Sequence, residues 1–90
     1  MASDLQLIPG IGKAMEQALF NIGVNTIADL KNRDPEELYL LNCQYKGYKD
    51  DKCVLYVFRL AVYYADHDTH AEEKLKWWYW QDKKYPPEKD

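Results

Sequence analysis

A short segment near the start of the chain has the residue types and spacing of an anion-binding turn. It reads Pro9-Gly10-Ile11-Gly12-Lys13, and a helical pattern follows it at once. Glycine accepts positive φ and lets a ligand come close to the backbone, and the first amides of a helix have no acceptor within that helix. The segment therefore predicts a hairpin between two helices whose amides, with the Lys13 ammonium, bind a phosphate. The alternative is that Gly10 and Gly12 only allow two helices to pack closely.

Charge limits how strong such binding can be. The chain has a formal net charge of −3, and residues 1–45 carry fewer basic than acidic side chains, whereas residues 46–90 balance the two. Lys13 is the only basic residue of the expected second helix, and Glu16 follows it within one turn. Because affinity for nucleic acid scales with the number of phosphates that are neutralised, we expect weak binding without base specificity.

Three further lysines, Lys46, Lys49 and Lys52, cluster just before an apolar segment. They are candidates for a second phosphate contact, because each could neutralise one backbone charge. A solvated charged loop explains the same cluster equally well.

Aromatic residues gather near the C-terminus, where Trp77, Trp78 and Trp80 surround Tyr79. Such rings stack on unpaired bases in proteins that bind single strands. They also remove large apolar areas from water, and we favour packing against the apolar segment 52–64, with one ring left for a partner.

Two cysteines and two histidines, Cys43, Cys53, His67 and His70, are residue types that bind zinc. The cysteines lack the close spacing of zinc ribbons, and Cys53 falls within the expected core helix. Free cysteine commonly acts as a small apolar residue, so we expect reduced cysteines, no metal at these four residues and no cofactor.

The sequence does not predict a catalytic site. It has no Gly-rich loop ending in Lys-Ser or Lys-Thr, and no nucleophile that can be placed beside a base. Arg59 is the lone charge in the apolar segment, and we expect it to pair with a carboxylate such as Glu37 or Asp66, since a buried guanidinium without a partner is costly. We therefore expect that the protein is not an enzyme.

Helix start and stop signals predict the elements that position these residues. Capping boxes are expected at Ser3 with Gln6, at Thr26 with Asp29 and at Thr69 with Glu72. Asp34 followed by Pro35 starts another helix, and Gly23 stands where a left-handed residue ends one. The helices expected from these signals span residues 4–7, 13–22, 27–30, 35–43, 52–64 and 73–80.

Residues 52–64 form a segment that is apolar on nearly every side. Its β-branched and aromatic residues are compatible with a strand, but its length and an N-cap at Asp50 or Asp51 favour a helix. A helix that is apolar all round needs cover on every face. We expect this cover from the C-terminal segment or from a second subunit.

The composition is that of one globular domain, with 47% apolar and 30% charged residues. We expect an all-α fold, a compact bundle of about five to six short helices over residues 1–80, with a flexible charged tail at 81–90. The apolar segment is too short to span a membrane, and no basic and then apolar leader stands at the N-terminus, so we expect a cytoplasmic protein.

The N-terminal part of the chain resembles a helix-hairpin-helix motif with its supporting helix. The resemblance covers residues 5–30, which hold the Ile-Pro-Gly-Ile-Gly turn and the following segment Ile22-Gly23-Val24-Asn25-Thr26. Such motifs occur in DNA repair polymerases, ligases and nucleases. Over about residues 5–80 the chain is similar to a small bacterial family called pathogenicity locus, or Cdd1-like, which is related to the C-terminal domain of TfoX competence regulators. The resemblance implies a compact, SAM/HhH-like all-α fold and DNA binding, and the family label names no reaction.

In helix-hairpin-helix proteins the hairpin holds a DNA phosphate without reading bases. The matching positions here are Gly10, Ile11, Gly12 and Lys13. Some relatives also bind a monovalent cation through hairpin carbonyls, which match those of Gln6, Ile8 and Ile11. The resemblance thus implies a small DNA-binding module that contacts the phosphate backbone. The alternative is a protein-interaction or homodimerisation module that uses segment 52–64 and the aromatic C-terminal segment.

Overall fold

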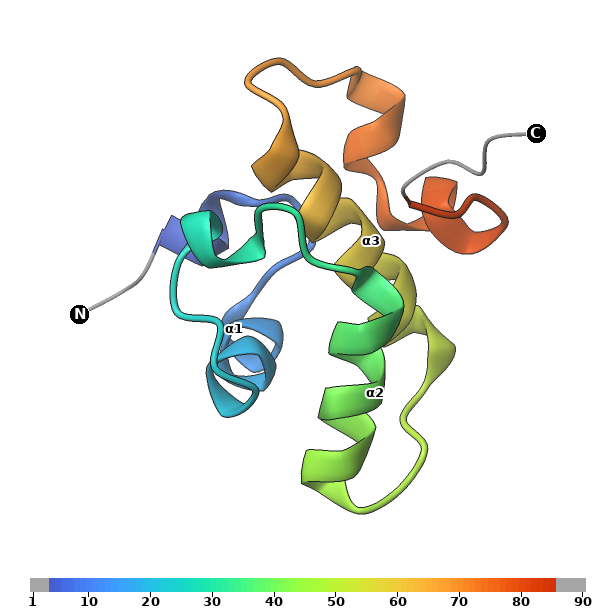
Figure 1. The fold of residues 1–90 in the computed structure, drawn as a ribbon. Helices are drawn as coiled ribbons and strands as arrows, with labels where there is room; N and C mark the ends of the chain where they lie inside the picture. Colours follow the sequence, from blue (N-terminus) through green and yellow to red (C-terminus); the bar gives the residue numbers. More distant parts are fainter. Residues whose placement is uncertain (1–3, 86–90) are drawn as a thin grey trace.

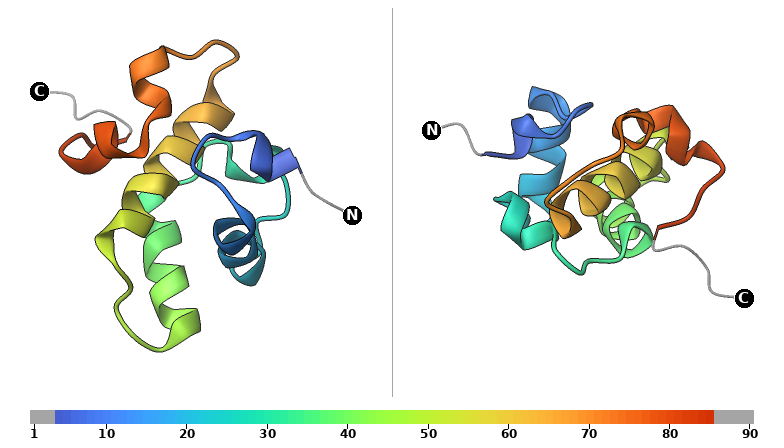
Figure 2. Two further views of the ribbon diagram at one scale, coloured as in Figure 1. Left: turned by 180° about the vertical axis from the view of Figure 1, so that it is seen from behind. Right: turned by 90° about the horizontal axis from the view of Figure 1, so that it is seen from above.

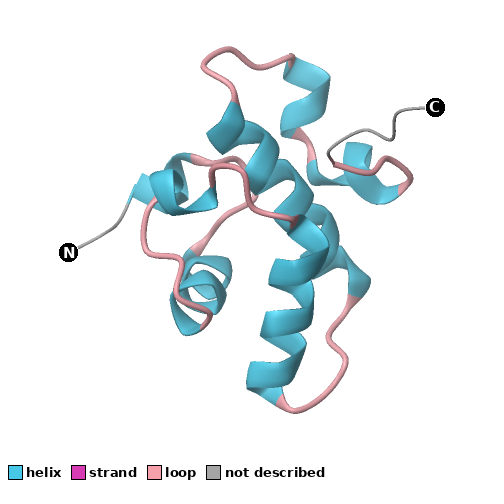
Figure 3. Cartoon of the chain, viewed as in Figure 1, coloured by secondary structure: helices cyan, strands magenta, loops and turns pink. Residues whose placement is uncertain are grey.

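A long helix, α3 (Lys52–Asp66), lies at the centre of the molecule (Figure 1). The computed structural model describes residues 4–85, and its radius of gyration of 12.2 Å is that of a compact domain. Within this range there are three α-helices and four short 3₁₀ segments and no strand (Figure 3). The expected all-α, compact fold is confirmed, whereas the expected count of five to six helices is wrong, because several of them are single 3₁₀ turns.

Other elements cover α3 on opposite sides. Figures 1 and 2 show the N-terminal elements on one side of α3 and the C-terminal segment on the other. Every residue of α3 from Val57 to Tyr63 is buried. The N-cap is Asp51, whose carboxylate accepts a hydrogen bond from the Cys53 amide at 3.2 Å. The prediction of a helix rather than a strand is confirmed, and α3 runs two residues farther than expected.

The hairpin joins η1 (Asp4–Leu7) to α1 (Lys13–Asn21). After α1 the amides of Gly23 and Val24 donate to the carbonyls of Phe20 and Leu19, which is the Schellman pattern. Gly23 has φ of 90°, so the predicted left-handed residue is confirmed. The capping residue Ser3 lies outside the described residues.

A second 3₁₀ segment, η2 (Ile27–Leu30), begins at the capping box that was expected from Thr26 and Asp29. The Thr26 hydroxyl accepts from the Asp29 amide at 3.3 Å, and the Asp29 carboxylate accepts from the Thr26 amide at 3.2 Å. The Ile27 amide also donates to Asp4 at 2.9 Å. This last bond ties η2 to η1, so the elements around the hairpin form one unit.

Helix α2 (Pro35–Lys46) starts where Asp34 and Pro35 predicted it. The Asp34 carboxylate accepts from the Glu36 amide at 3.0 Å. The helix ends at Gly47, whose amide donates to the Cys43 carbonyl at 2.9 Å. It is therefore about one turn longer than expected, and its last turn carries Lys46 toward the loop that leads to α3.

The predicted helix 73–80 is wrong, because the chain forms two separate 3₁₀ segments, η3 (Glu72–Leu75) and η4 (Trp77–Gln81). Lys76 between them is extended, with φ −101° and ψ 126°. The Trp80 indole donates to the Lys74 carbonyl at 2.9 Å, so a side chain takes an acceptor that a continuous helix would use. The capping box expected at Thr69 is also wrong, since Ala71 precedes η3 and no side chain caps it.

The cover that α3 needs comes from its own chain. The packed core draws on every part of residues 4–85, from Leu5 in η1 to Trp80 in η4. Of the predicted tail, Gln81 ends η4 and Tyr85 packs against the core, while residues 86–90 lie outside the described range. No helix of the described part has the length and apolarity that crossing a membrane requires.

Candidate functional site

Two backbone hydrogen bonds hold the hairpin in a tight turn. The Ile8 amide donates to the Leu5 carbonyl and the Ile11 amide donates to the Ile8 carbonyl, each at 3.1 Å. Gly10 has φ of 87°, a conformation that side chains rarely adopt. A Cβ on Gly10 would lie 3.7 Å from Leu60, which is ordinary contact. The turn therefore requires glycine at position 10 for its backbone conformation, and crowding against α3 is not the reason.

The apolar residues of the hairpin anchor it on the core. The side chains of Leu5, Ile8 and Ile11 are buried. Among the predicted phosphate-binding residues, Ile11 thus supplies a core side chain, and its amide already has an acceptor. The Ile8 carbonyl accepts the hydrogen bond from that amide. Binding of a monovalent cation by the carbonyls of Gln6, Ile8 and Ile11 stays a prediction.

Gly12 stands directly before α1, at the N-cap position. Its φ of −97° and ψ of −167° are extended and open to any residue. Nothing lies within 4 Å of the place where a Cβ would stand. No side chain caps the helix, so the first amides of α1 have no side-chain acceptor at this end. Neither strain nor packing requires glycine at this position.

Lys13, the first residue of α1, is exposed and has no ion pair within residues 4–85. Glu16 follows one turn later and is buried. Its carboxylate accepts a hydrogen bond from the Gln6 side chain at 3.0 Å, which ties η1 to α1. A carboxylate in the first turn interacts favourably with the helix dipole and reduces the positive potential there. Lys13 is the only basic residue within α1 itself.

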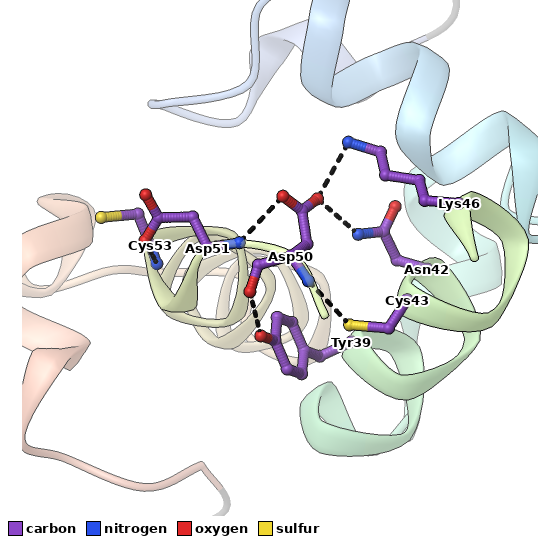
Figure 4. Close-up of polar contacts among 7 residues, drawn as sticks. All are labelled: Tyr39, Asn42, Cys43, Lys46, Asp50, Asp51 and Cys53. Carbon is purple, nitrogen blue, oxygen red and sulfur yellow. Dashed lines mark hydrogen bonds and ion pairs between the residues drawn. The ribbon is translucent and has the colours of Figure 1, made fainter. Parts of the chain in front are cut away.

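Lys46 has an anionic partner within the chain. Its ammonium lies 2.9 Å from the Asp50 carboxylate (Figure 4). This hydrogen-bonded ion pair lowers the pKa of Asp50 and raises the pKa of Lys46. Lys49 and Lys52 are exposed, and neither has an ion pair in the described part of the chain. Of the three lysines predicted as a second phosphate contact, two therefore remain without an anionic partner there.

Asp50 connects α2 to the loop before α3 (Figure 4). Its carboxylate also accepts from the Asn42 amide group at 2.9 Å, and its carbonyl accepts the Tyr39 hydroxyl. Its own amide donates to the Cys43 sulfur at 3.3 Å. Burial raises the pKa of the Tyr39 phenol, and its hydrogen bond with Cys43 acts in the same direction. Sequence reasoning missed this cluster, because it treated Asp50 only as a possible cap.

A shallow groove of about 510 Å³ lies beside the end of α2. It is lined by residues of α2 and of the following loop, namely Tyr39, Leu40, Cys43, Gln44, Gly47, Tyr48 and Lys49. Leu40 and Tyr48 are 59% and 60% exposed. Sequence reasoning did not identify this apolar surface, because it forms only where the end of α2 and the following loop lie side by side.

The three tryptophans differ in exposure. Trp80 is 3% exposed, and its ring centroid lies 5.4 Å from that of Tyr63 in α3. Trp77 is half-buried and meets Trp78 edge to face, with centroids 5.7 Å apart. Trp78 is 55% exposed. Packing on α3 therefore accounts for Trp80, and Trp78 is the ring that stays at the surface.

Arg59 pairs with a carboxylate, but not with either of those expected. One terminal nitrogen lies 3.6 Å from the Glu36 carboxylate, and the other donates to the Trp80 carbonyl at 2.7 Å. Glu37 pairs with Arg33 instead, at 3.7 Å. Asp66, at the end of α3, accepts the Tyr85 hydroxyl at 2.6 Å. The predicted partners Glu37 and Asp66 are wrong because each has a nearer donor.

The cysteines and histidines do not converge on one site. Cys53 lies in the first turn of α3 and is exposed, whereas His67 and His70 follow its last turn, roughly 20 Å away along a helix of this length. The ring nitrogens of His67 and His70 donate to the carbonyls of Tyr63 and Tyr64 at 3.0 and 2.9 Å. Within residues 4–85 no group of three such side chains is placed to hold a metal ion.

The similarity to known proteins extends over nearly the whole chain. The mitomycin resistance protein McrB of Streptomyces lavendulae is 31% identical over 87 residues, which span 97% of this chain and 74% of that protein. No solved structure gives a significant match. The relations to helix-hairpin-helix proteins and to TfoX stay predictions. The Cdd1 family, described as pathogenicity locus, matches residues 1–85, a range that holds the hairpin, the Asp50 cluster and η4 together. The chain therefore belongs to the Cdd1 pathogenicity locus family.

Proposed function

We propose that this protein is a small DNA-binding module of the helix-hairpin-helix kind that contacts backbone phosphate through the η1–α1 hairpin. The observation that carries the proposal is the environment of Gly12. Neither packing nor backbone conformation requires glycine at position 12, and this glycine leaves the start of α1 without a capping side chain. A phosphate oxygen can approach such an open helix start closely.

The binding chemistry is limited to a few groups. The first amides of α1 are donors without intrahelical acceptors, and the exposed Lys13 ammonium supplies the positive charge. The same groups contact only the backbone, so they carry no base specificity. We propose weak, salt-sensitive binding, in the cytoplasm and without catalysis. The name of the relative McrB refers to mitomycin resistance, which makes survival of mitomycin the cellular phenotype to examine.

A salt series tests the proposal. A labelled duplex of about 20 base pairs should bind at low salt, and the logarithm of the affinity should fall with the logarithm of the salt concentration, by about 0.9 per neutralised phosphate. Lys13→Glu should abolish this binding. Gly12→Ser should weaken it while the fold stays intact, because the serine hydroxyl would cap the amides itself.

Lys31→Glu is the matched control, because Lys31 is also exposed and the substitution changes the net charge equally. Equal losses from Lys13→Glu and Lys31→Glu would mean that net charge alone governs binding. No binding of the parent protein at low salt would remove the proposal altogether.

A second candidate function, homodimerisation or another protein contact, is favoured by the groove beside α2. The alternative expected from the sequence used segment 52–64 and the aromatic C-terminal segment. Helix α3 is covered by its own chain, whereas Leu40 and Tyr48 are exposed beside the groove. Sedimentation at micromolar concentration tests it. A dimer that Leu40→Lys returns to monomer supports this candidate, and a monomer at all concentrations argues against homodimerisation.

A further inference from the structure

The C-terminal segment carries an exposed surface that the hairpin does not involve. Trp78 is 55% exposed, and the Lys76 ammonium lies 5.8 Å from the centroid of its ring. The Lys83 ammonium lies 5.9 Å from the ring centroid of Tyr79. We call Lys76, Trp78, Tyr79 and Lys83 the aromatic-lysine surface. Cations at this distance interact with the faces of aromatic rings, so each of these two lysines places positive charge beside a ring.

The neighbouring tryptophan holds this surface in place. Trp80 packs on α3, its indole donates to the Lys74 carbonyl at 2.9 Å, and its carbonyl accepts from Arg59 at 2.7 Å. A 3₁₀ segment has three residues per turn, so Trp77 and Trp80 share one side of η4 and Trp78 does not. Because Trp80 is anchored, the Trp78 side chain lies on the outer side of η4. A ligand that binds there would have to order few side chains.

The charge of the segment differs from that of the protein. From Lys74 to Tyr85 the chain carries four lysines and one acidic residue, Asp82, although the net charge of the whole chain is −3. Glu72 and Glu73 precede this stretch on η3. Local positive charge beside exposed rings favours an anionic partner that also has flat apolar groups. Single-stranded nucleic acid has both, whereas the bases of a duplex are stacked and closed to a side chain.

We propose that the aromatic-lysine surface binds single-stranded nucleic acid. An unpaired base stacks on the ring of Trp78. The ammonium groups of Lys76 and Lys83 move away from the aromatic rings and pair with the phosphates on either side of that base. Stacking accepts every base because every base has a π face, so the site has little sequence preference. This surface is separate from the hairpin and does not depend on the function proposed for it.

Tryptophan fluorescence reports on η4 and its immediate surroundings, because all three tryptophans of the chain lie within residues 77–80 and Trp78 is the exposed one. Oligothymidine of about 12 nucleotides should quench the fluorescence with saturation at low salt, since that length exceeds the smallest sites known for single strands. A blunt duplex of the same length should quench it much less. Absence of quenching by the single strand, or equal quenching by the duplex, would overturn the proposal.

Variants identify the groups involved, with labelled oligothymidine and fluorescence anisotropy as the readout. Trp78→Ala should weaken binding by about 5- to 150-fold. Tyr48→Ala is the matched control, because Tyr48 is 60% exposed on a different part of the molecule, and it should leave binding unchanged. Lys76→Gln and Lys83→Gln should each reduce the salt slope by about 0.7.

Two further measurements separate this proposal from its rivals. Lys13→Glu should leave oligothymidine binding unchanged, and its loss in that variant would assign the binding to the hairpin. Polyglutamate of matched charge should bind far more weakly, and equal binding would show that charge alone suffices. If Trp78→Ala unfolds at the same temperature as the parent protein and still binds oligothymidine equally well, the stacking site does not exist.

Discussion

The Arg59 guanidinium of α3 donates a 2.7 Å hydrogen bond to the backbone carbonyl of Trp80 in η4. Arg59 is 7% exposed, and it also lies 3.6 Å from the Glu36 carboxylate of α2. One side chain thus joins three elements that are far apart in the sequence. This contact is one of those that hold η4 on α3, together with the packing of Trp80 against Tyr63.

Arg59→Ala should lower the free energy of unfolding by about 1–3 kcal/mol, because it leaves the Trp80 carbonyl without its donor at a buried contact. Glu36→Gln should change it by less than about 1 kcal/mol, since Glu36 is 54% exposed and exposed ion pairs contribute little. Urea unfolding followed by tryptophan fluorescence measures both. Equal losses would mean that the ion pair, and not the Trp80 carbonyl, is the main partner of Arg59.

Asp50→Ala should destabilise the fold by about 2 kcal/mol at neutral pH, because hydrogen bonds to a charged acceptor contribute more than neutral ones. The Lys46 ammonium holds the folded-state pKa of Asp50 below its ordinary value near 4. The stabilisation is therefore complete above that ordinary value and is lost as the pH falls through the folded-state pKa.

The difference in unfolding free energy between parent and Asp50→Ala should accordingly shrink as the solution is acidified below about pH 4. Asp68→Ala is the control, because Asp68 is exposed and has no hydrogen bond in the described part of the chain. A difference that stays constant with pH would show that Asp50 acts through backbone contacts and not through its charge.

Local signals in the sequence predicted three of the starts, although the capping box expected at Thr69 is wrong. The capping residues Thr26, Asp34 and Asp51 each accept the expected amide, because a cap depends on residues two or three positions away. The hairpin turn at Gly10 and the end of α1 at Gly23 were predictable for the same reason, since both glycines occupy left-handed conformations that few other residues adopt. These features need no knowledge of the rest of the fold.

Tertiary contacts decided what the sequence could not predict. The segment 73–80 has helical signals, but the Trp80 indole bonds the Lys74 carbonyl and the helix is broken at Lys76. Lys46 was predicted as a second phosphate contact or as part of a solvated loop, yet Asp50 lies four residues on across the end of α2 and pairs with it. The open space around Gly12 is likewise a property of the packed molecule, which local signals in the sequence do not predict.

The two hairpin glycines should respond differently to substitution. Gly10→Ala should cost about 1–2 kcal/mol, because alanine is strained at φ of 87°. Gly10→Asn should cost less, since asparagine tolerates this region better. Gly12→Ser should be neutral or slightly stabilising, because serine is a favourable N-cap residue and the site has room for it. Thermal unfolding measures all three, and equal losses at both glycines would contradict the roles assigned to them.

Tyr85→Phe should destabilise the fold by about 1.5 kcal/mol, the lower end for a hydrogen bond to a charged acceptor, because Tyr85 is only half-buried. Its hydroxyl donates to Asp66 at 2.6 Å, and Asp66 also accepts the Asn32 amide at 2.8 Å. Burial raises the pKa of the Tyr85 phenol, and the bond to Asp66 acts in the same direction. Stability from the neutral phenol is therefore complete below the ordinary tyrosine pKa near 10 and is lost as the pH rises above it.

Urea unfolding at neutral and alkaline pH tests the direction of this pH dependence. The parent protein should lose its advantage over Tyr85→Phe as the pH rises above about 10, because the phenol then ionises in the unfolded chain while burial and the Asp66 carboxylate keep it neutral in the folded protein. Tyr45→Phe is the matched control, since Tyr45 is exposed and makes no hydrogen bond within residues 4–85. If the difference between parent and Tyr85→Phe persists at alkaline pH, the hydroxyl stabilises the fold by some contact other than the bond to Asp66.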